Sequence, residues 1–357
     1  MKKFALVALV LVVVIAVAGY LLRRPITMAL VGAAVSRNMQ STLLDDLPDG
    51  LHVGLCGAGS PLPDPERSGP CVAVIAGDRV FVIDSGSGAS RNLAQMRIPQ
   101  GQIEGILLTH FHSDHIDGLG EVLLQRWVGG SSSEPTPVHG PEGVETVVAG
   151  FNQAYGQDFV YRVAHHGEEV VPSSGAGAVA RGFPLPGAGE GVKIVDDGDL
   201  VVTAFAVDHE PVNPAVGYRF DYKDRSILVS GDTSKSANLE EFAEGVDLLV
   251  HEALAPQLVG ALNAAAQAAG RTNLAKVTDD ILTYHATPVQ VAEVARDSDA
   301  QELLFYHVVP PLILPTMEEI FVEGVAEVYD GPVTVGADGT FMSLPSGSSA
   351  IEKKDLL

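Results

Sequence analysis

Cysteine is scarce in this sequence: 357 residues contain only Cys56 and Cys71. Two cysteines cannot build a disulfide framework, and their spacing does not match a zinc knuckle. Both lie in segments that we expect to be neighbouring strands, residues 51–57 and 71–77. We favour buried free thiols at these positions, with a single disulfide in an oxidising compartment as the alternative.

Basic residues are also few. There are 22 Lys and Arg against 45 Asp and Glu, which gives a formal net charge of −23. Enzymes that bind nucleic acid usually carry a basic stripe, because neutralising phosphates supplies most of their affinity. No cluster of Lys and Arg occurs beyond the amino terminus. The composition therefore argues against a polyanionic substrate and against nucleic acid as a partner.

An uncharged apolar run covers residues 4–22, between Lys2-Lys3 and Arg23-Arg24. A helix of this length can span a bilayer. We expect an uncleaved membrane anchor rather than a cleaved signal, because a secretory signal usually has a shorter apolar core. The bulk of the chain is then expected to be exported and held on the periplasmic side of the inner membrane.

Apolar runs of strand length recur along the rest of the chain, with helical patterns between them, in two halves. Apolar residues make up 46% of the chain, which is enough for a sizeable core. The pattern predicts an α/β fold in which two sheets pack together and helices cover their outer faces. We predict a membrane anchor or signal segment (residues 1–24) and a linker with a juxtamembrane helix (25–50). One catalytic domain (51–344) and a disordered tail (345–357) follow. Residues 172–191, rich in Gly, Ala and Pro, are expected to form a surface loop.

The stretch Thr109–His115 is the strongest chemical signal. It carries His110, His112, Asp114 and His115 directly after a short apolar run. Imidazole and carboxylate ligands at this density suit borderline divalent metals such as zinc. A buried strand before them would be a rigid place to mount such ligands. A solvated loop with four such side chains by chance is the disfavoured alternative.

Three further ligand candidates each follow an apolar strand closely: His209, Asp232 and His307. They complete a predicted binuclear site. Its first ion is held by His110, His112 and His209, its second by Asp114, His115 and His307, and Asp232 bridges the two. Asp114 is also counted among the catalytic residues. Zinc is the expected metal, with manganese or iron as alternatives. A hydroxide between two such ions is a nucleophile at neutral pH.

The arrangement resembles the metallo-β-lactamase superfamily, and within it the branch of ribonuclease Z and the bacterial arylsulfatase-like proteins. The resemblance covers residues 51–343 and rests on these segments: His110–His115, Asp208-His209, Gly217-Tyr218-Arg219, Ser230–Thr233, His251–Ala253, Tyr284–Thr287 and His307–Pro311. It implies an αββα sandwich and a hydrolase of phosphodiester or sulfate ester bonds. It also implies that His285 protonates the leaving group while Glu252 orients it. A plain salt bridge for Glu252 and a helix cap for His285 are the alternatives.

One departure from the ribonuclease Z pattern bears on which substrate the protein cleaves. Ribonuclease Z carries a long arm that grips tRNA between the motifs matching Gly217-Tyr218-Arg219 and Ser230–Thr233. Only the ten residues Phe220–Val229 separate these motifs here, which is enough for a hairpin. With the acidic composition and the apolar amino terminus, this argues against tRNA processing.

The leading hypothesis is therefore an exported, membrane-tethered hydrolase in which a metal-bridging hydroxide attacks a small anionic sulfate or phosphate ester, as in an arylsulfatase. A ribonuclease Z-type tRNA 3′ endonuclease or phosphodiesterase is the alternative. A lactonase or β-lactamase fits the Glu252 and His285 pair less well, and a non-catalytic binding module would be expected to have lost ligands. Related proteins include dimers, so an oligomer is compatible with the sequence.

Several residues near these motifs remain open. Asp84 ends a predicted strand, where it is either the partner of a ligand histidine or a turn cap. Trp127 has helical spacing with apolar neighbours, which favours core packing. His165 and His166 are expected in a solvated loop.

Overall fold

The computed structural model describes residues 2–357, and the chain divides into two compact units, Met1–Asp46 and Leu47–Leu357. The first unit contains a long helix, α1 (Lys2–Gln40), and a 3-10 turn, η1 (Leu44–Asp46). The predicted linker is thus helical as far as Gln40. Within α1, Leu6–Gly32 reaches a mean hydropathy of 2.7 and is long and apolar enough to cross a membrane. Its placement in a membrane stays a prediction.

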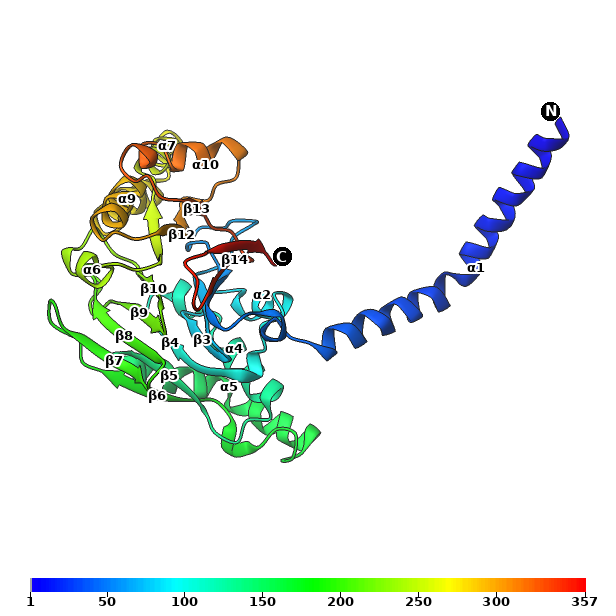
Figure 1. The fold of residues 1–357 in the computed structure, drawn as a ribbon, viewed down its shortest axis with the longest axis horizontal. Helices are drawn as coiled ribbons and strands as arrows, with labels where there is room; N and C mark the ends of the chain where they lie inside the picture. Colours follow the sequence, from blue (N-terminus) through cyan, green and yellow to red (C-terminus); the bar gives the residue numbers. More distant parts are fainter. Residues whose placement is uncertain (1) are drawn as a thin grey trace. The chain divides into compact units, whose positions relative to one another are not determined.

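The second unit is built from two β-sheets with helices on their outer sides (Figure 1). The first sheet has eight strands, in the spatial order β15 (Glu352–Asp355), β14 (Thr340–Pro345), β1 (Gly50–Gly57), β2 (Cys71–Ala76), β3 (Arg79–Ile83), β4 (Ile103–Leu107), β5 (Thr136–Pro141) and β6 (Ala178–Phe183). The second has seven, in the order β13 (Val333–Val335), β12 (Glu302–Val309), β11 (Leu248–Leu254), β10 (Arg225–Val229), β9 (Val216–Tyr222), β8 (Leu200–Ala206) and β7 (Gly191–Asp196).

Each sheet contains a run of parallel neighbours. The run is β3–β4–β5–β6 in the first sheet and β10–β11–β12–β13 in the second. Parallel neighbours bring their carboxyl ends to the same edge, and in open α/β sheets this edge is where ligands bind. The other connections in each sheet are antiparallel, including the predicted hairpin of β9 and β10, in which Tyr222 pairs with Arg225.

Helices cover the outer face of each sheet. Those that follow strands of the first sheet are α2 (Ala89–Gln95), α3 (Ser113–Ile116), α4 (Leu119–Gly130) and α5 (Val144–His166). Those that follow strands of the second are α6 (Ala237–Phe242), α7 (Pro256–Ala268), α8 (Thr272–Asp280), α9 (Pro288–Asp297) and α10 (Pro315–Phe321). The short 3-10 turns are η2 (Gln100–Gln102), η3 (Ser173–Gly175), η4 (Ile281–Thr283) and η5 (Val325–Glu327).

The main core lies between the two sheets. Both sheets contribute large buried apolar side chains to it, among them Leu51, Val74, Phe81, Phe220, Val250 and Leu304. A second cluster fills the space between the second sheet and its helices and includes Phe205, Val291 and Phe321. Strands such as β11 are buried along their whole length, because one face meets the other sheet and the other face meets a helix. The αββα sandwich is therefore confirmed, as is the core position of Trp127.

The favoured interpretation of the cysteines as free thiols is wrong. Cys56 and Cys71 form a disulfide that joins β1 to β2. The two strands are antiparallel neighbours, and an irregularity in their register places Gly57 opposite Cys71. The sequence predicted adjacent strands, but adjacency leaves register open, and register decides whether two cysteines face each other.

Two segments that were expected to be irregular contain strands. The predicted disordered tail includes β15, which pairs antiparallel with β14 at the edge of the first sheet. The predicted loop at residues 172–191 includes β6, which pairs parallel with β5 at the opposite edge. All of β15 is exposed, and β6 is buried only at its two ends, so neither strand has the apolar alternation by which a half-buried strand is recognised. The helix α5 continues to His166, so His165 and His166 lie exposed at its end rather than in a loop.

Loss of the Cys56–Cys71 bond should destabilise the second unit. A disulfide with a sequence separation of 15 restricts the unfolded chain, an effect of about 3 kcal/mol for a loop of this size. The double substitution Cys56→Ala and Cys71→Ala should lower the free energy of unfolding by ~2–3 kcal/mol in urea denaturation. Reduced wild-type protein is the matched control because it keeps both side chains. Equal stability of the oxidised and reduced protein would contradict the prediction.

Candidate metal centre

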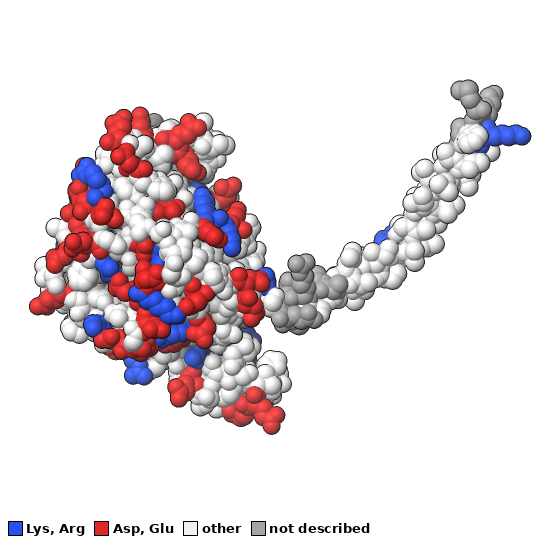
Figure 2. Space-filling model, in the orientation of Figure 1, with Lys and Arg blue, Asp and Glu red and all other residues white. Residues whose placement is uncertain are grey.

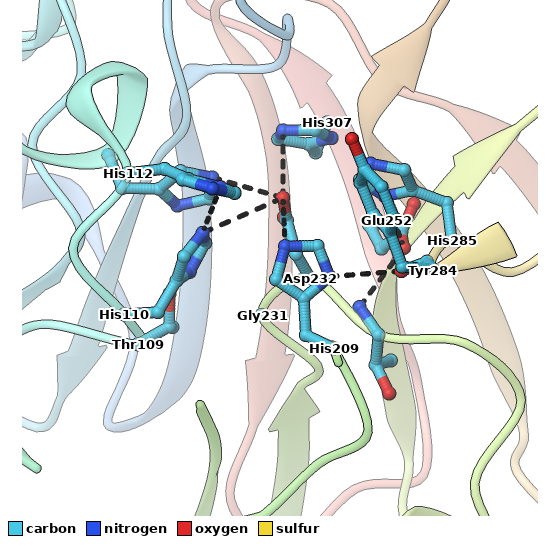
Figure 3. A network of polar contacts seen from close by, with 12 residues as sticks. Thr109, His110, His112, His209, Gly231, Asp232, Glu252, Tyr284, His285 and His307 are labelled. Carbon is cyan, nitrogen blue, oxygen red and sulfur yellow. Dashed lines mark hydrogen bonds and ion pairs between the residues drawn. The ribbon is translucent and has the colours of Figure 1, made fainter. Parts of the chain in front are cut away.

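The candidate site lies where strands of both sheets reach their carboxyl ends. His110 and His112 follow β4, and Asp114 lies in the first turn of the short helix α3. On the second sheet, His209 follows β8 and Asp232 follows β10. The remaining predicted ligands, His115 and His307, lie in α3 and β12. Figure 3 shows His110, His112, His209 and His307 arranged around the carboxylate of Asp232.

Asp232 lies at the centre of the cluster. Its Oδ2 is 3.3 Å from His115 Nε2 and 3.4 Å from His307 Nε2. The same oxygen is 3.9 Å from Nε2 of His110 and 3.9 Å from Nε2 of His209. One carboxylate oxygen therefore faces imidazoles from both halves of the chain.

Asp114 makes a second carboxylate contact in the cluster. Its Oδ2 lies 3.4 Å from His307 Nε2 and 3.5 Å from His115 Nε2. The potential ligand atoms form three groups. Two match the predicted division, with His110, His112, His209 and Asp232 in one and Asp114, His115 and His307 in the other, and the third joins Asp232 and His307 to His285. Within each group, all ligand atoms lie within 4.8 Å of one another. The structure thus brings together all seven side chains that the sequence proposed.

The cluster fits divalent metal ions. His115 Nε2, His209 Nε2 and Asp232 Oδ1 are buried and have no hydrogen-bond partner among the described residues. A buried polar atom without a partner costs about 1–3 kcal/mol, so several of them facing one point indicate a ligand there. Two ligands bound to one tetrahedral zinc lie roughly 3.4 Å apart. The separations around Asp114 and Asp232 are close to this value, and the nitrogen and oxygen donors suit zinc, manganese or iron.

In three of the histidines, the Nδ1 atom has a partner, and this partner decides which ring nitrogen is available to a metal ion. His115 Nδ1 lies 2.8 Å from Asp84 Oδ2, and His209 Nδ1 lies 2.9 Å from the carbonyl oxygen of Tyr284. His110 Nδ1 lies 3.1 Å from Thr109 Oγ1. Each of these oxygens can accept the Nδ1 hydrogen, which leaves Nε2 as the metal-binding atom.

Asp84 organises the first half of the cluster. Its Oδ2 accepts hydrogen bonds from His115 and from the hydroxyl of Thr109, and its Oδ1 accepts from the backbone N–H of Thr109. Thr109 in turn contacts His110, so one buried carboxylate orients two ligand histidines. Between the two open interpretations of Asp84, the structure supports the partner of a ligand histidine.

Backbone geometry places two of these residues. Asp84 has φ 56° and His307 has φ 43°, in the left-handed region that non-glycine residues seldom adopt. In the pairing of β11 with β12, Glu252 is opposite Tyr306 and Ala253 is opposite Val308, so His307 is the extra residue of a β-bulge. A bulge turns a side chain away from the regular alternation of the strand. We had expected His307 at the end of a strand, but it lies inside β12.

Burial and charge shift the pKa values of the cluster's histidines in opposite directions. Burial lowers the pKa of His110 well below its ordinary value, and it also lowers the pKa of His209. Burial alone would lower the pKa of His115 too, but the carboxylates of Asp232, Asp84 and Asp114 raise it well above the ordinary value. A ligand imidazole must be neutral, so metal binding at His115 would displace a proton.

Glu252 and His285 lie beside the cluster as a hydrogen-bonded pair. His285 Nδ1 is 2.9 Å from Glu252 Oε1, which also accepts from the backbone N–H of Thr233. Burial alone would lower the pKa of His285, but the buried Glu252 carboxylate raises it to about 9. The helix-cap interpretation of His285 is wrong, because Thr287 is the N-cap of α9.

The cluster opens into a cavity of about 130 Å³ whose wall includes residues that we did not predict. Leu274 and Val277 come from α8, and Ile281 and Tyr284 from the segment after it. Their spacing of three and four residues is a helical signal that was present in the sequence. His52, His139 and His251 lie outside this cavity lining.

Comparison with known proteins is consistent with this geometry. A model of the metallo-beta-lactamase superfamily matches residues 64–303. A ribonuclease Z of Mycobacterium avium is 33% identical over 290 residues, which cover 81% of this chain and 96% of the relative. A ribonuclease Z of Mycolicibacterium gilvum is 32% identical over 296 residues, which cover 81% of this chain and 94% of the relative.

Solved structures share the fold at lower identity. The metallo-beta-lactamase fold protein YhfI of Bacillus subtilis aligns with a TM-score of 0.59 and 18% identity, covering 82% of this chain and 99% of that protein. The short form of human tRNase Z aligns with a TM-score of 0.56 and 22% identity, again covering 82% of this chain and 99% of the other.

Proposed function

This chain belongs to the metallo-beta-lactamase superfamily, and we propose that it is a binuclear metal-dependent phosphodiesterase with a catalytic site of the ribonuclease Z type. The observation that carries the proposal is the Glu252–His285 pair next to seven converging ligand side chains. A cluster of ligands alone would fit many metal-dependent hydrolases. A buried, protonated imidazole beside the cluster suits a reaction in which a leaving oxygen needs a proton.

The reported relatives change the ranking of substrates. They carry the name ribonuclease Z, so they favour the alternative hypothesis over the arylsulfatase-like one that we ranked first. We therefore place phosphodiesters before sulfate esters. The metal-dependent hydrolase itself, which both hypotheses share, is unaffected by this change.

The site residues form two groups: those that would hold the metal ions and those that would take part in proton transfer. One divalent ion would be held by His110, His112 and His209 and the other by Asp114, His115 and His307, with Asp232 within reach of both. Two bound divalent ions supply an activated water and stabilise negative charge on the phosphate. Asp84 keeps His115 in the tautomer that can bind. His285 donates its proton to the leaving oxygen, and Glu252 holds the ring in position and keeps it protonated.

An RNA 3′ end is the second candidate substrate, and only the names of the relatives favour it. The net charge is −23, and acidic side chains outnumber basic ones over the face of the domain in Figure 2. The hairpin of β9 and β10 turns between Tyr222 and Arg225, where a ribonuclease Z would carry its tRNA-gripping arm. Small phosphodiesters therefore come first.

We also propose that the second unit is exported and tethered by α1. The apolar window Leu6–Gly32 has the length of a membrane span. The Cys56–Cys71 disulfide supports export independently, because such bonds persist mainly in oxidising compartments.

The test of the proposed function is a substrate panel for the zinc-loaded full chain: bis-p-nitrophenyl phosphate, p-nitrophenyl sulfate, a lactone, a β-lactam and a tRNA precursor. We expect metal-dependent cleavage of the phosphodiester to exceed that of the sulfate by more than tenfold in kcat/KM. Faster cleavage of the sulfate would reverse the ranking. Efficient, site-specific cleavage of the tRNA precursor would establish the second candidate instead.

His285→Ala should separate proton donation from metal binding. General acid catalysis contributes roughly 10²–10⁴-fold, so kcat should fall by that factor on an alkyl phosphodiester, whose leaving alkoxide needs a proton. The loss should be much smaller with p-nitrophenolate, a stable leaving anion. Metal content, measured by inductively coupled plasma mass spectrometry, should stay at two ions per chain. Loss of an ion would make His285 a ligand and not the acid.

Glu252→Gln should move the alkaline limb of the pH–rate profile to lower pH. The active form of His285 is protonated, so activity falls as pH rises through its pKa. The Glu252 carboxylate raises that pKa to about 9, and removing an adjacent charge should lower it by roughly 1–3 units. Glu293→Gln, which removes a carboxylate paired with Lys235, is the matched control. An unmoved limb in Glu252→Gln would show that His285 does not set it.

A further inference from the structure

The helices α7 and α8 lie in the chain between the two members of the catalytic pair, after Glu252 and before His285. They pack on each other, and the side-chain amide of Asn263 on α7 holds α8. It donates to the carbonyl oxygen of Ala275 at 2.8 Å and to Asp279 Oδ1 at 2.8 Å. The position of α8 is therefore fixed beside the catalytic pair.

One face of α8 is apolar and lines the cavity. Leu274 and Val277 of α8 and Ile281 just after it, which we call the apolar stripe, follow at intervals of three and four residues and all contribute to the cavity wall. Ala275 and Thr278 are buried instead. An amphipathic helix usually buries its apolar stripe in the core. Here Ile281 packs against a small apolar cluster, but Leu274 remains 39% exposed and Val277 53% exposed.

Residues of the candidate metal centre and its neighbour His285 line the same cavity. They are His112, Asp114, Asp232, His285 and His307, while Leu62 and Val309 extend the apolar wall. A group bound against the apolar stripe would thus lie next to an ester held at the cluster. The volume is about 130 Å³, and apolar protein cavities of about 150 Å³ admit a benzene molecule. There is room for one ring or a short alkyl chain.

A nucleobase suits this wall poorly. Its edge carries donors and acceptors that need partners once buried. Outside the candidate metal centre, the side-chain hydroxyls of the wall are those of Ser60, Thr278 and Tyr284, and the Thr278 hydroxyl already donates to the carbonyl oxygen of Leu274 at 2.9 Å. An alkyl or aryl group has no such requirement and gains from every apolar contact.

We propose that the apolar stripe of α8 is a substrate subsite that binds an alkyl or aryl substituent of the phosphodiester. This inference rests on the proposed function and specifies its substrate: a phosphodiester that carries an apolar group on the oxygen not being cleaved. The acidic composition and the small number of hydroxyl groups in the described wall agree with such a substrate.

The test varies the retained substituent and keeps the leaving group constant. The substrates are methyl, ethyl, butyl and phenyl p-nitrophenyl phosphate, and the zinc-loaded full chain is held in lipid nanodiscs, because detergent would compete for the cavity. Each buried methylene should raise kcat/KM roughly three- to fourfold, so butyl should exceed methyl by about 30- to 60-fold. Isothermal titration with methylphosphonate and butylphosphonate should show the same preference in affinity, without turnover.

Val277→Thr should lower the butyl-to-methyl ratio at least threefold in both measurements, because it keeps the shape of the side chain and adds a hydroxyl. Val160→Thr on α5 is the matched control: Val160 is 60% exposed, similar to Val277, and lies outside the cavity lining. Its ratio should equal that of the wild type.

Two outcomes separate this proposal from the proposed function. The subsite would be overturned if the enzyme is active but has equal kcat/KM along the series and equal affinity for both phosphonates. A protein that cleaves no phosphodiester but binds butylphosphonate more tightly than methylphosphonate would overturn the proposed function and support the subsite.

Discussion

The buried carboxylate of Asp232 is the contact on which this site depends. A single oxygen of Asp232 lies within 3.9 Å of four imidazole nitrogens that come from both sheets. Burial alone would raise the pKa of this carboxyl group, but the surrounding histidines hold it well below its ordinary value. An anion in this place is compatible with burial only because positive charge, from protonated imidazoles or from metal ions, faces it. The two halves of the sandwich are thereby joined at their reactive edge as well as through their core.

Hydrogen bonds and local backbone geometry fix the positions of the candidate ligands at that edge. Asp84 connects Thr109, His110 and His115 through hydrogen bonds of 2.8–3.1 Å. His307 reaches the cluster through a bulge and a left-handed backbone conformation, a local departure from regular structure of the kind that accumulates at functional sites. The same parallel-strand edge that positions the candidate ligands also positions Glu252, so these ligands and the partner of His285 share one rigid scaffold.

The proposed chemistry and the proposed specificity belong to different parts of the second unit. Most of the candidate ligands lie in or just after strands, and Glu252 lies within β11, where position is fixed by sheet pairing. The apolar stripe lies on α8, a helix inserted between the members of that pair and held by Asn263. An insertion of this kind can change the shape and polarity of the substrate cavity while the strand-borne residues keep their geometry.

The sequence by itself determined the superfamily, the candidate ligands and the pair proposed for catalysis, because a dense histidine motif and its distant partners lie close to apolar strands that are recognisable locally. It also predicted the β9–β10 hairpin from the short segment between two motifs. Tertiary structure alone decided the Cys56–Cys71 bond, since strand adjacency does not fix register. It decided the contacts of Asp84, which join separate segments, and the pairing of the edge strands β6 and β15. It also decided that Leu274 and Val277 face a cavity, because helical periodicity shows that a face is apolar but not what that face meets.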